Sequence, residues 1–344
     1  MLYTHATIIT VNSSREILLD GAILVQGSSI VAIEKTDTLL ARYPNEPTTD
    51  LTDRIVIPGL VNAHMHCAQT LLRDTGDDLE LVHWLCERIW PLQGNFTPED
   101  GEAAARGSVV EMLRGGTTCF LESMFADRYG FDGLCRAVEQ SGIRGCLGKI
   151  VMDMPTYAQD PKWAMHSGLV ETRDASLGGA IKMWEKWDGK ADGRIRVWFG
   201  ARTPGGVSDE LYKEMTALSR TKGIPITMHC AETALEMATI NGARALGLDD
   251  RIGSLEVGKK ADFVAIDTRK VSMQPWFNPV SAVVYVATGE DVELVVVDGK
   301  EVVRGGKVLT MDEEAVWREL QVKAAEVVQR AGLKEKIKSR WHVR

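Results

Sequence analysis

Two histidines separated by one residue, His64 and His66, are the residues of this sequence whose types and spacing point most directly to chemistry. They end the stretch PGLVNAHMH, which follows the apolar run 55–57. Side chains alternate between the two faces of a β-strand, so residues i and i+2 point the same way. Both imidazoles can therefore reach one metal ion at the end of a strand. A second apolar strand, 224–229, ends in His229, with Glu232 three residues further on. This pattern predicts a hydrolytic metal site.

The segments around these histidines are predicted to alternate between strands and helices. After a first strand at 55–66, apolar runs predict strands at 117–121, 144–151, 195–200 and 224–229. Helical patterns predict helices at 131–141, 177–187 and 208–221. Such alternation is typical of a parallel sheet. Ligands at the carboxyl ends of its strands fit the active-site face of an α/β barrel.

The two ends of the chain are predicted to consist of short strands separated by turns. Strands are predicted at 7–11, 22–26 and 30–34, and again at 261–266, 292–297 and 301–304. We therefore expect a composite β-sandwich from residues 1–57 and 251–310, a truncated hydrolase barrel over 58–250, and a C-terminal helix within 311–344. In that helix Thr310 and Glu313 form a capping-box pattern, and Trp317 shares a face with Leu320.

Composition excludes several classes of protein. The 344 residues are 44% hydrophobic with a net charge of −8, which suffices for one large core plus a smaller domain. No basic block would meet a nucleic-acid backbone. No apolar stretch approaches the ~18–20 residues that span a bilayer, and the N-terminus lacks the features of a signal peptide. We expect a cytoplasmic protein that binds neither nucleic acid nor membrane.

Taken together, the motifs resemble the amidohydrolase superfamily, specifically its branch of methylthioadenosine/S-adenosylhomocysteine deaminases and triazine hydrolases. The resemblance rests on PGLVNAHMH (58–66), QTLLR (69–73), GGTT (115–118), HCAET (229–233) and the segment 238–262. These blocks follow one another in the family's order along nearly the whole chain.

The resemblance implies a (β/α)8-type barrel plus a β-sandwich built from both chain ends. It implies that His64, His66 and His229 bind one divalent metal, zinc, with iron as the alternative. Glu232 resembles the carboxylate that transfers protons. In such enzymes the metal activates a water that attacks an electron-poor ring carbon, and an acidic group protonates the leaving amine.

Three further residues bear on the substrate. Nucleoside-deaminating relatives carry a Glu near the position of Gln93 and a His in the loop that here contains Arg202. A neutral amide gives a hydrogen bond worth about 1 kcal/mol, against about 1.5–3 kcal/mol for a charged partner. Arg202 could instead pair with an anionic substrate, and Trp84 could line the pocket. These differences favour an amino- or halo-substituted heterocycle other than a nucleoside.

The chain departs from the family pattern after Thr233. Family members carry a further His after the sixth strand and an Asp after the eighth, but here 234–242 already resembles the final barrel helix. Strands six to eight are therefore expected to be missing. A five-strand sheet cannot close as an eight-strand barrel does, and its open edge should favour a homo-oligomer.

Three hypotheses stay open at this point. The chain is a metal-dependent deaminase of a heterocycle, or a catalytically inactive truncated relative that persists as an oligomer. The third is a metal-binding scaffold whose open edge pairs with another chain by strand addition.

Overall fold

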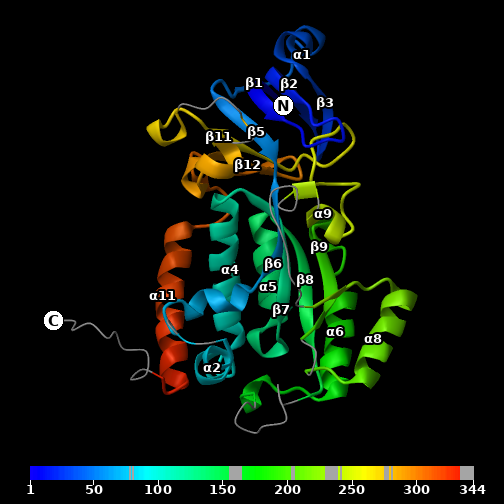
Figure 1. Ribbon diagram of the computed structural model, residues 1–344, viewed down its shortest axis with the longest axis vertical. Coiled ribbons are helices and arrows are strands. Elements are labelled where there is room, and N and C mark those ends of the chain that lie inside the picture. The colour runs from blue at the N-terminus through cyan, green and yellow to red at the C-terminus, as the bar shows by residue number, and fades with distance from the viewer. Residues whose placement is uncertain are drawn as a thin grey trace, which may run out of the picture.

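The computed structural model describes residues 1–76, 79, 81–154, 165–202, 206–228, 239–240, 242–274, 279 and 282–333. Within these residues the strands form two separate sheets, and the helices lie mainly against the second. Figure 1 shows one sheet, made from both chain ends, above a parallel sheet whose strands run away from it.

The first sheet has nine strands in the described part of the chain, in the order β14-β13-β12-β11-β5-β1-β2-β3, with β4 paired to β1. Strand β5 joins the two chain ends, because it runs parallel to β1 and antiparallel to β11. Its members are β1 (Leu2–Ile9), β2 (Ile17–Gln26), β3 (Ser29–Lys35), β4 (Thr48–Asp50), β5 (Arg54–Pro58), β11 (Phe263–Asp267), β12 (Val292–Val297), β13 (Lys300–Arg304) and β14 (Lys307–Val308).

The second sheet is parallel, with the order β10-β9-β8-β7-β6 among the residues described. Its strands are β6 (Leu60–Met65), β7 (Thr117–Phe125), β8 (Arg144–Val151), β9 (Ile195–Ala201) and β10 (Ile226–Thr227). The predicted mixed α/β fold with an incomplete parallel barrel sheet and a separate sheet is confirmed.

One expected strand proves to be two. The run 55–57 was expected to carry the histidines, but it belongs to β5 in the first sheet, and His64 lies on β6 in the second. The division falls at Gly59, where a Cβ atom would come within 2.2 Å of the Thr118 hydroxyl. Only a residue without a side chain fits here, so the chain can turn from one sheet into the other.

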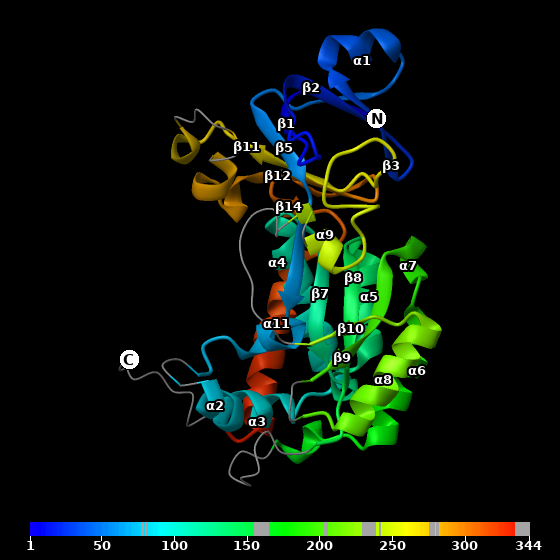
Figure 2. The same cartoon turned by 45° about the vertical axis from the view of Figure 1, so that its right-hand side comes forward.

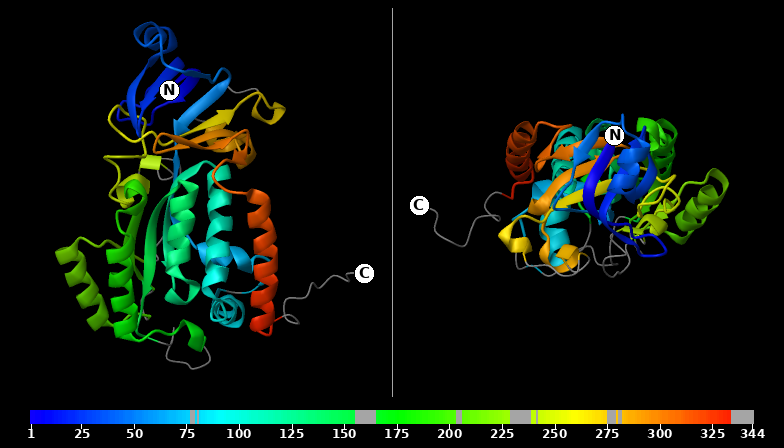
Figure 3. Two further views of the ribbon diagram at one scale, coloured as in Figure 1. Left: turned by 180° about the vertical axis from the view of Figure 1, so that it is seen from behind. Right: turned by 90° about the horizontal axis from the view of Figure 1, so that it is seen from above.

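Helices cover one face of the parallel sheet. They are α4 (Pro98–Arg114), α5 (Phe131–Ser141), α6 (Arg173–Trp187) and α8 (Asp209–Lys222), with α11 (Glu313–Arg330) packed beside α4 (Figures 1 and 3). Shorter helical segments are α1 (Thr36–Arg42), η1 (Cys67–Leu72), α2 (Leu81–Trp84), η2 (Leu85–Ile89), α3 (Trp90–Gln93), η3 (Asp127–Tyr129), η5 (Ser167–Leu169), α7 (Lys190–Gly193), α9 (Gly242–Ala245), η7 (Val271–Met273), η8 (Ala282–Val286) and η9 (Gly289–Asp291).

Helix α4 is absent from the predicted helices although Glu102 and Arg106 mark its more exposed side, because the side it buries consists largely of small residues that give weak apolar contrast. Its middle, including Ala104 and Gly107, is buried between the sheet and α11. Its start is nevertheless well defined, because Thr97 and Asp100 form a reciprocal capping box.

The opposite face of the parallel sheet, which would be the interior of a closed barrel, is covered by a short stretch of chain. The buried side chains on this face are Val61, Cys119, Leu121, Cys146 and Trp198. They pack against Ala243, Leu246, Leu248 and Ile252, which belong to α9 and the residues that follow it. Apolar burial on both faces therefore stabilises the sheet even though it has five strands here.

The C-terminal helix differs in detail from the expectation. Asp312, not Thr310, caps it by accepting the Ala315 N–H, while Glu313 accepts the Val308 N–H. The Trp317 side chain is 59% exposed, so the packed face of α11 is narrower than predicted. No helix in the described part of the chain combines the length and apolarity needed to cross a bilayer.

Candidate functional site

His64 lies on β6 and His66 follows that strand directly, so both lie at its carboxyl end. The strands of the parallel sheet run away from the nine-stranded sheet (Figure 2). Their ring centres are 4.9 Å apart and the ring planes cross at 88°. Two imidazoles that bind one zinc through ~2.0–2.1 Å bonds at a tetrahedral angle have ring centres about 5 Å apart. The spacing of the two rings is therefore compatible with both histidines binding one zinc ion.

The backbone around the two histidines is held by short-range hydrogen bonds. The His64 N–H donates to the Asn62 side-chain oxygen at 3.1 Å, and the His66 carbonyl accepts the Gln69 N–H at 3.0 Å. Segment η1 begins directly after His66, and its first N–H, that of Cys67, donates to Glu122 Oε2 at 2.8 Å. The turn after His66 is thus tied to the neighbouring strand β7.

Glu122 is a site residue that the sequence reasoning missed. It lies on β7 opposite Met65, and its side chain is fully buried. Burial raises its pKa to about 7, and hydrogen bonds from the Cys67 thiol and N–H oppose this rise. A signal was present in the sequence, since Glu122 is the single charged residue in the strand TTCFLESMF.

We predict that Glu122→Gln weakens the dependence of stability on pH. The carboxyl has a pKa of about 7 in the folded protein and an ordinary value of 4.5. As pH rises between these values the unfolded chain loses its proton and the folded chain keeps it, so the wild-type free energy of unfolding falls. The fall amounts to about 3 kcal/mol at 1.36 kcal/mol per pKa unit, and it is complete above about pH 7.

Urea unfolding of both proteins at pH 5 and pH 8 measures this difference. The Gln variant, which does not titrate, should gain stability relative to the wild type at pH 8. The nearby Cys67 and Tyr129 do not interfere, because burial raises their pKa values above this range. Equal pH dependence in the two proteins would show that Glu122 is ionised at pH 5.

Two predicted site residues, His229 and Glu232, lie outside the described residues. Strand β10 ends just before them and runs parallel to β9, with Thr227 opposite Gly200. Within the described ranges no group of three His, Cys, Asp or Glu side chains is placed to hold a metal. The roles of His229 and Glu232 stay predictions.

The structure brings two of the predicted substrate residues to the same end of the parallel sheet. Arg202 follows β9, and its guanidinium lies 5.5 Å from the ring centre of Trp90, which begins α3. Gln93 ends the same short helix and is buried. Trp84 ends α2 and is half-buried beside Gly76. Trp90 is buried and supports the arginine.

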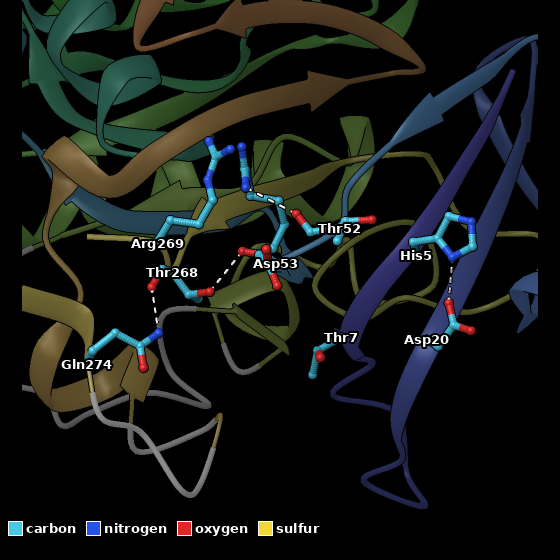
Figure 4. Close-up of a pocket in the computed structure, with 9 residues that line it drawn as sticks. His5, Thr7, Asp20, Thr52, Asp53, Thr268, Arg269 and Gln274 are labelled. Atoms are coloured by element: carbon cyan, nitrogen blue, oxygen red, sulfur yellow. Dashed lines mark hydrogen bonds and ion pairs between the residues drawn. The ribbon is translucent and has the colours of Figure 1, made fainter. Parts of the chain in front are cut away.

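A polar cavity elsewhere does not contain these residues. It has a volume of about 720 Å³ and lies in the nine-stranded sheet, lined by His5, Thr7, Asp20, Thr52, Asp53, Arg54, Thr268, Arg269 and Gln274. Figure 4 shows its polar side chains bonded locally, with His5 paired to Asp20 and Gln274 donating to the Thr268 carbonyl. Several polar groups that line the cavity thus bind one another.

Comparison with known proteins decides the family. The model of the Amidohydrolase family matches residues 55–236 and 231–302, which together make up most of the chain. The chain belongs to the Amidohydrolase family. The predicted resemblance is confirmed, and with it the expectation of a hydrolase of C–N bonds.

Several relatives are similar to this amidohydrolase over their full length. A 5-methylthioadenosine/S-adenosylhomocysteine deaminase of Pelotomaculum thermopropionicum is 25% identical over 449 residues, covering 96% of this chain and 99% of the relative. A 5'-deoxyadenosine deaminase of Methanosarcina acetivorans is 25% identical over 456 residues, with 96% and 99% covered.

Solved structures share the fold of this amidohydrolase. An adenosine deaminase from Xanthomonas campestris with bound zinc superposes with a TM-score of 0.83 at 24% identity, covering 95% of this chain and 98% of that one. Atrazine chlorohydrolase from Arthrobacter aurescens TC1, complexed with zinc, has a TM-score of 0.78 at 17% identity, with 94% and 99% covered.

This amidohydrolase is shorter than its relatives. The match to the Pelotomaculum enzyme runs over 449 residues although this chain has 344, so more than a hundred positions have no counterpart here. The two segments matched by the family model meet at 231–236. The predicted loss of part of the barrel after the fifth strand agrees with both observations.

Proposed function

We propose that this amidohydrolase is a metal-dependent enzyme that deaminates an amino-substituted heterocycle. The observation that carries the proposal is the His64–His66 pair, whose ring spacing fits one zinc ion at the end of the first barrel strand. The deaminases among the similar proteins support the reaction class, because their named substrates carry an amino group on a purine ring.

Individual residues of this chain would have the following roles. His64 and His66 would hold the metal together with His229, and zinc is the ion named in two similar structures. When bound, such an ion activates water for attack on an electron-poor ring carbon. Glu232 would carry a proton from that water to the leaving amine, as the motif resemblance implies.

The substrate end of the site is expected to recognise a flat, anionic molecule. Arg202 presents a positive charge beside the aromatic face of Trp90, and Gln93 on the same helix is neutral. Guanidinium groups pair with carboxylates through charge-assisted hydrogen bonds. We therefore propose an amino-heterocycle with an acidic substituent as the preferred substrate, rather than an unsubstituted nucleoside.

Ammonia release from a panel of amino-heterocycles, with and without carboxylate substituents, tests the function. We expect zinc-reconstituted protein to release ammonia from at least one compound, and a chelator to stop the reaction. Arg202→Met should raise KM for acidic substrates roughly 10- to 100-fold, as expected for the loss of a charged hydrogen bond worth about 1.5–3 kcal/mol. KM for neutral substrates should not change.

Two outcomes would contradict the proposal. Full metal loading without ammonia release from any compound would identify the chain as a metal-binding scaffold. Absence of bound zinc or iron after reconstitution would identify a truncated relative without chemistry. The missing barrel segment is the observation that favours this second reading.

We also infer that the chain forms a homo-oligomer. Among the described strands, β6 pairs only with β7 and β10 only with β9, so both margins of the parallel sheet are edges. Unpaired edges are sites where a second chain adds. Light scattering on the purified protein should give at least twice the chain mass of 37.9 kDa, and a stable monomer would contradict the inference.

A further inference from the structure

One buried carboxyl group stands beside the two histidines and has no part in the chemistry proposed above. Glu122 is 0% exposed, lies opposite Met65 in the pairing of β6 with β7, and accepts the Cys67 N–H through Oε2 at 2.8 Å. Its other oxygen, Oε1, has no hydrogen-bond partner among the described residues. The group therefore contacts the peptide that immediately follows His66.

Such a group lowers the stability of the fold, so its presence at this position calls for a role other than packing. A buried polar atom without a partner costs about 1–3 kcal/mol, and an apolar side chain of the same size avoids that cost. Two positions before Glu122 on the same strand, Phe120 joins the apolar core, which shows what packing alone selects there. Packing therefore does not explain a carboxyl group at position 122.

The contact with Cys67 belongs to a set that holds the backbone of this residue on both sides of its Cα atom. While Glu122 accepts the Cys67 N–H, the Cys67 carbonyl accepts the Ser108 hydroxyl at 3.2 Å. Ser108 in turn lies 2.6 Å from the Thr70 hydroxyl. Strand β7, helix α4 and segment η1 thus converge on the residue after His66. The direction in which His66 leaves the strand depends on this arrangement.

We propose that Glu122 is a positioning residue whose carboxyl group, by holding the Cys67 N–H, sets the turn that aims His66 at the same point as His64. The proposal rests on the metal-binding function proposed above. Groups that orient metal ligands from outside the coordination sphere typically change metal affinity 10- to 100-fold when they are removed. Glu122 would act through the backbone rather than by touching the ion or the substrate.

Two substitutions at this position separate positioning from bulk packing. Glu122→Leu keeps the size and removes the acceptor, whereas Glu122→Gln keeps a carbonyl oxygen that can accept the same N–H. Thr118→Val, on the same strand, removes a buried hydroxyl that finds no hydrogen-bond partner among the described residues, and it serves as the control. The full-length chain, labelled with ¹⁵N-cysteine, gives a signal for each of its six cysteines. Loss of one signal in Cys67→Ala assigns the Cys67 amide.

The first readout is hydrogen exchange of the Cys67 amide in metal-free protein. We expect slow exchange in the wild type, in Glu122→Gln and in Thr118→Val, and exchange at least tenfold faster in Glu122→Leu. The second readout is the dissociation constant for zinc, expected to rise 10- to 100-fold in Glu122→Leu only. Unchanged exchange and unchanged zinc affinity in a folded Glu122→Leu protein would overturn the proposal.

The two readouts also distinguish failure of this proposal from failure of the proposed function. A wild type that binds no zinc contradicts the proposed function. The exchange rates, measured without metal, then still test whether Glu122 holds the Cys67 N–H. If Glu122→Leu does not fold, the wild type itself is decisive. Rapid exchange of its Cys67 amide would show that the hydrogen bond to Glu122 does not hold the turn.

Discussion

Replacing His64 with alanine is expected to abolish metal binding. Zinc sites with four ligands bind with about 10–16 kcal/mol, so each ligand contributes about 3 kcal/mol, and loss of one weakens binding more than hundredfold. His64 and His66 already have the spacing that one ion requires, so neither can be removed without losing that arrangement. Elemental analysis of dialysed protein should find about one ion per wild-type chain and none in the variant.

His83→Ala is the matched control for this experiment. His83 lies on α2, bonds to Glu87 one turn further along, and its side chain is 42% exposed. Its replacement should leave the metal content at the wild-type value. Metal content that is the same in His64→Ala and the wild type would show that the ion, if any, binds elsewhere and that the ligand assignment is wrong.

Replacing Arg144 with methionine is expected to destabilise the protein by about 3–5 kcal/mol, the usual cost of removing one partner from a buried ion pair. Arg144 begins β8 and donates through Nη2 to Asp262 and Asp298, at 2.9 Å each. Asp262 precedes β11 and Asp298 follows β12, so this one guanidinium connects the parallel sheet to the nine-stranded sheet.

The electrostatics of the cluster explain the size of this effect. The exposed fractions of the Arg144, Asp262 and Asp298 side chains are 5%, 2% and 9%. Burial alone would raise the pKa of Asp298, but its ion pairs with Arg144 and Lys260 outweigh burial and lower it. Without the arginine, two carboxylates stay buried with Lys260 as the nearest remaining cation, 3.1 Å from Asp298.

Denaturant unfolding of Arg144→Met measures the loss. Arg106→Met is the control, because Arg106 pairs with Glu319 at 2.6 Å but both side chains are about a third exposed. Exposed pairs contribute between 0 and about 1 kcal/mol. Equal losses of unfolding free energy in the two variants would show that the buried cluster stabilises the protein no more than an exposed ion pair does.

Patterns of residues along the chain determined much of the fold. The predicted limits of the strands at 144–151 and 292–297 and of the helix at 131–141 coincide with those observed. Each of these elements is specified by residues that are close together in the sequence, through apolar periodicity and flanking turn residues. The family resemblance likewise rests on motifs that are local in sequence, and the comparisons confirm it.

Features that depend on packing between distant parts of the chain could not be predicted from such local patterns. Residues 55–66 were predicted as one strand, whereas the structure divides them between two sheets at Gly59, which packs closely against Thr118. Helix α4 escaped prediction because the side it buries consists largely of small residues such as Ala103, Ala104 and Gly107, which give weak contrast with its charged side.

By itself the sequence determined the family, the reaction class and the paired histidines, since strand periodicity brings residues i and i+2 to one face wherever the strand lies. Tertiary structure decided which distant groups meet: Glu122 at the peptide after His66, and Arg144 between two carboxylates of the other sheet. These contacts join residues 55, 118 and 154 positions apart. Such contacts depend on how complete sheets and helices pack, which no local pattern encodes.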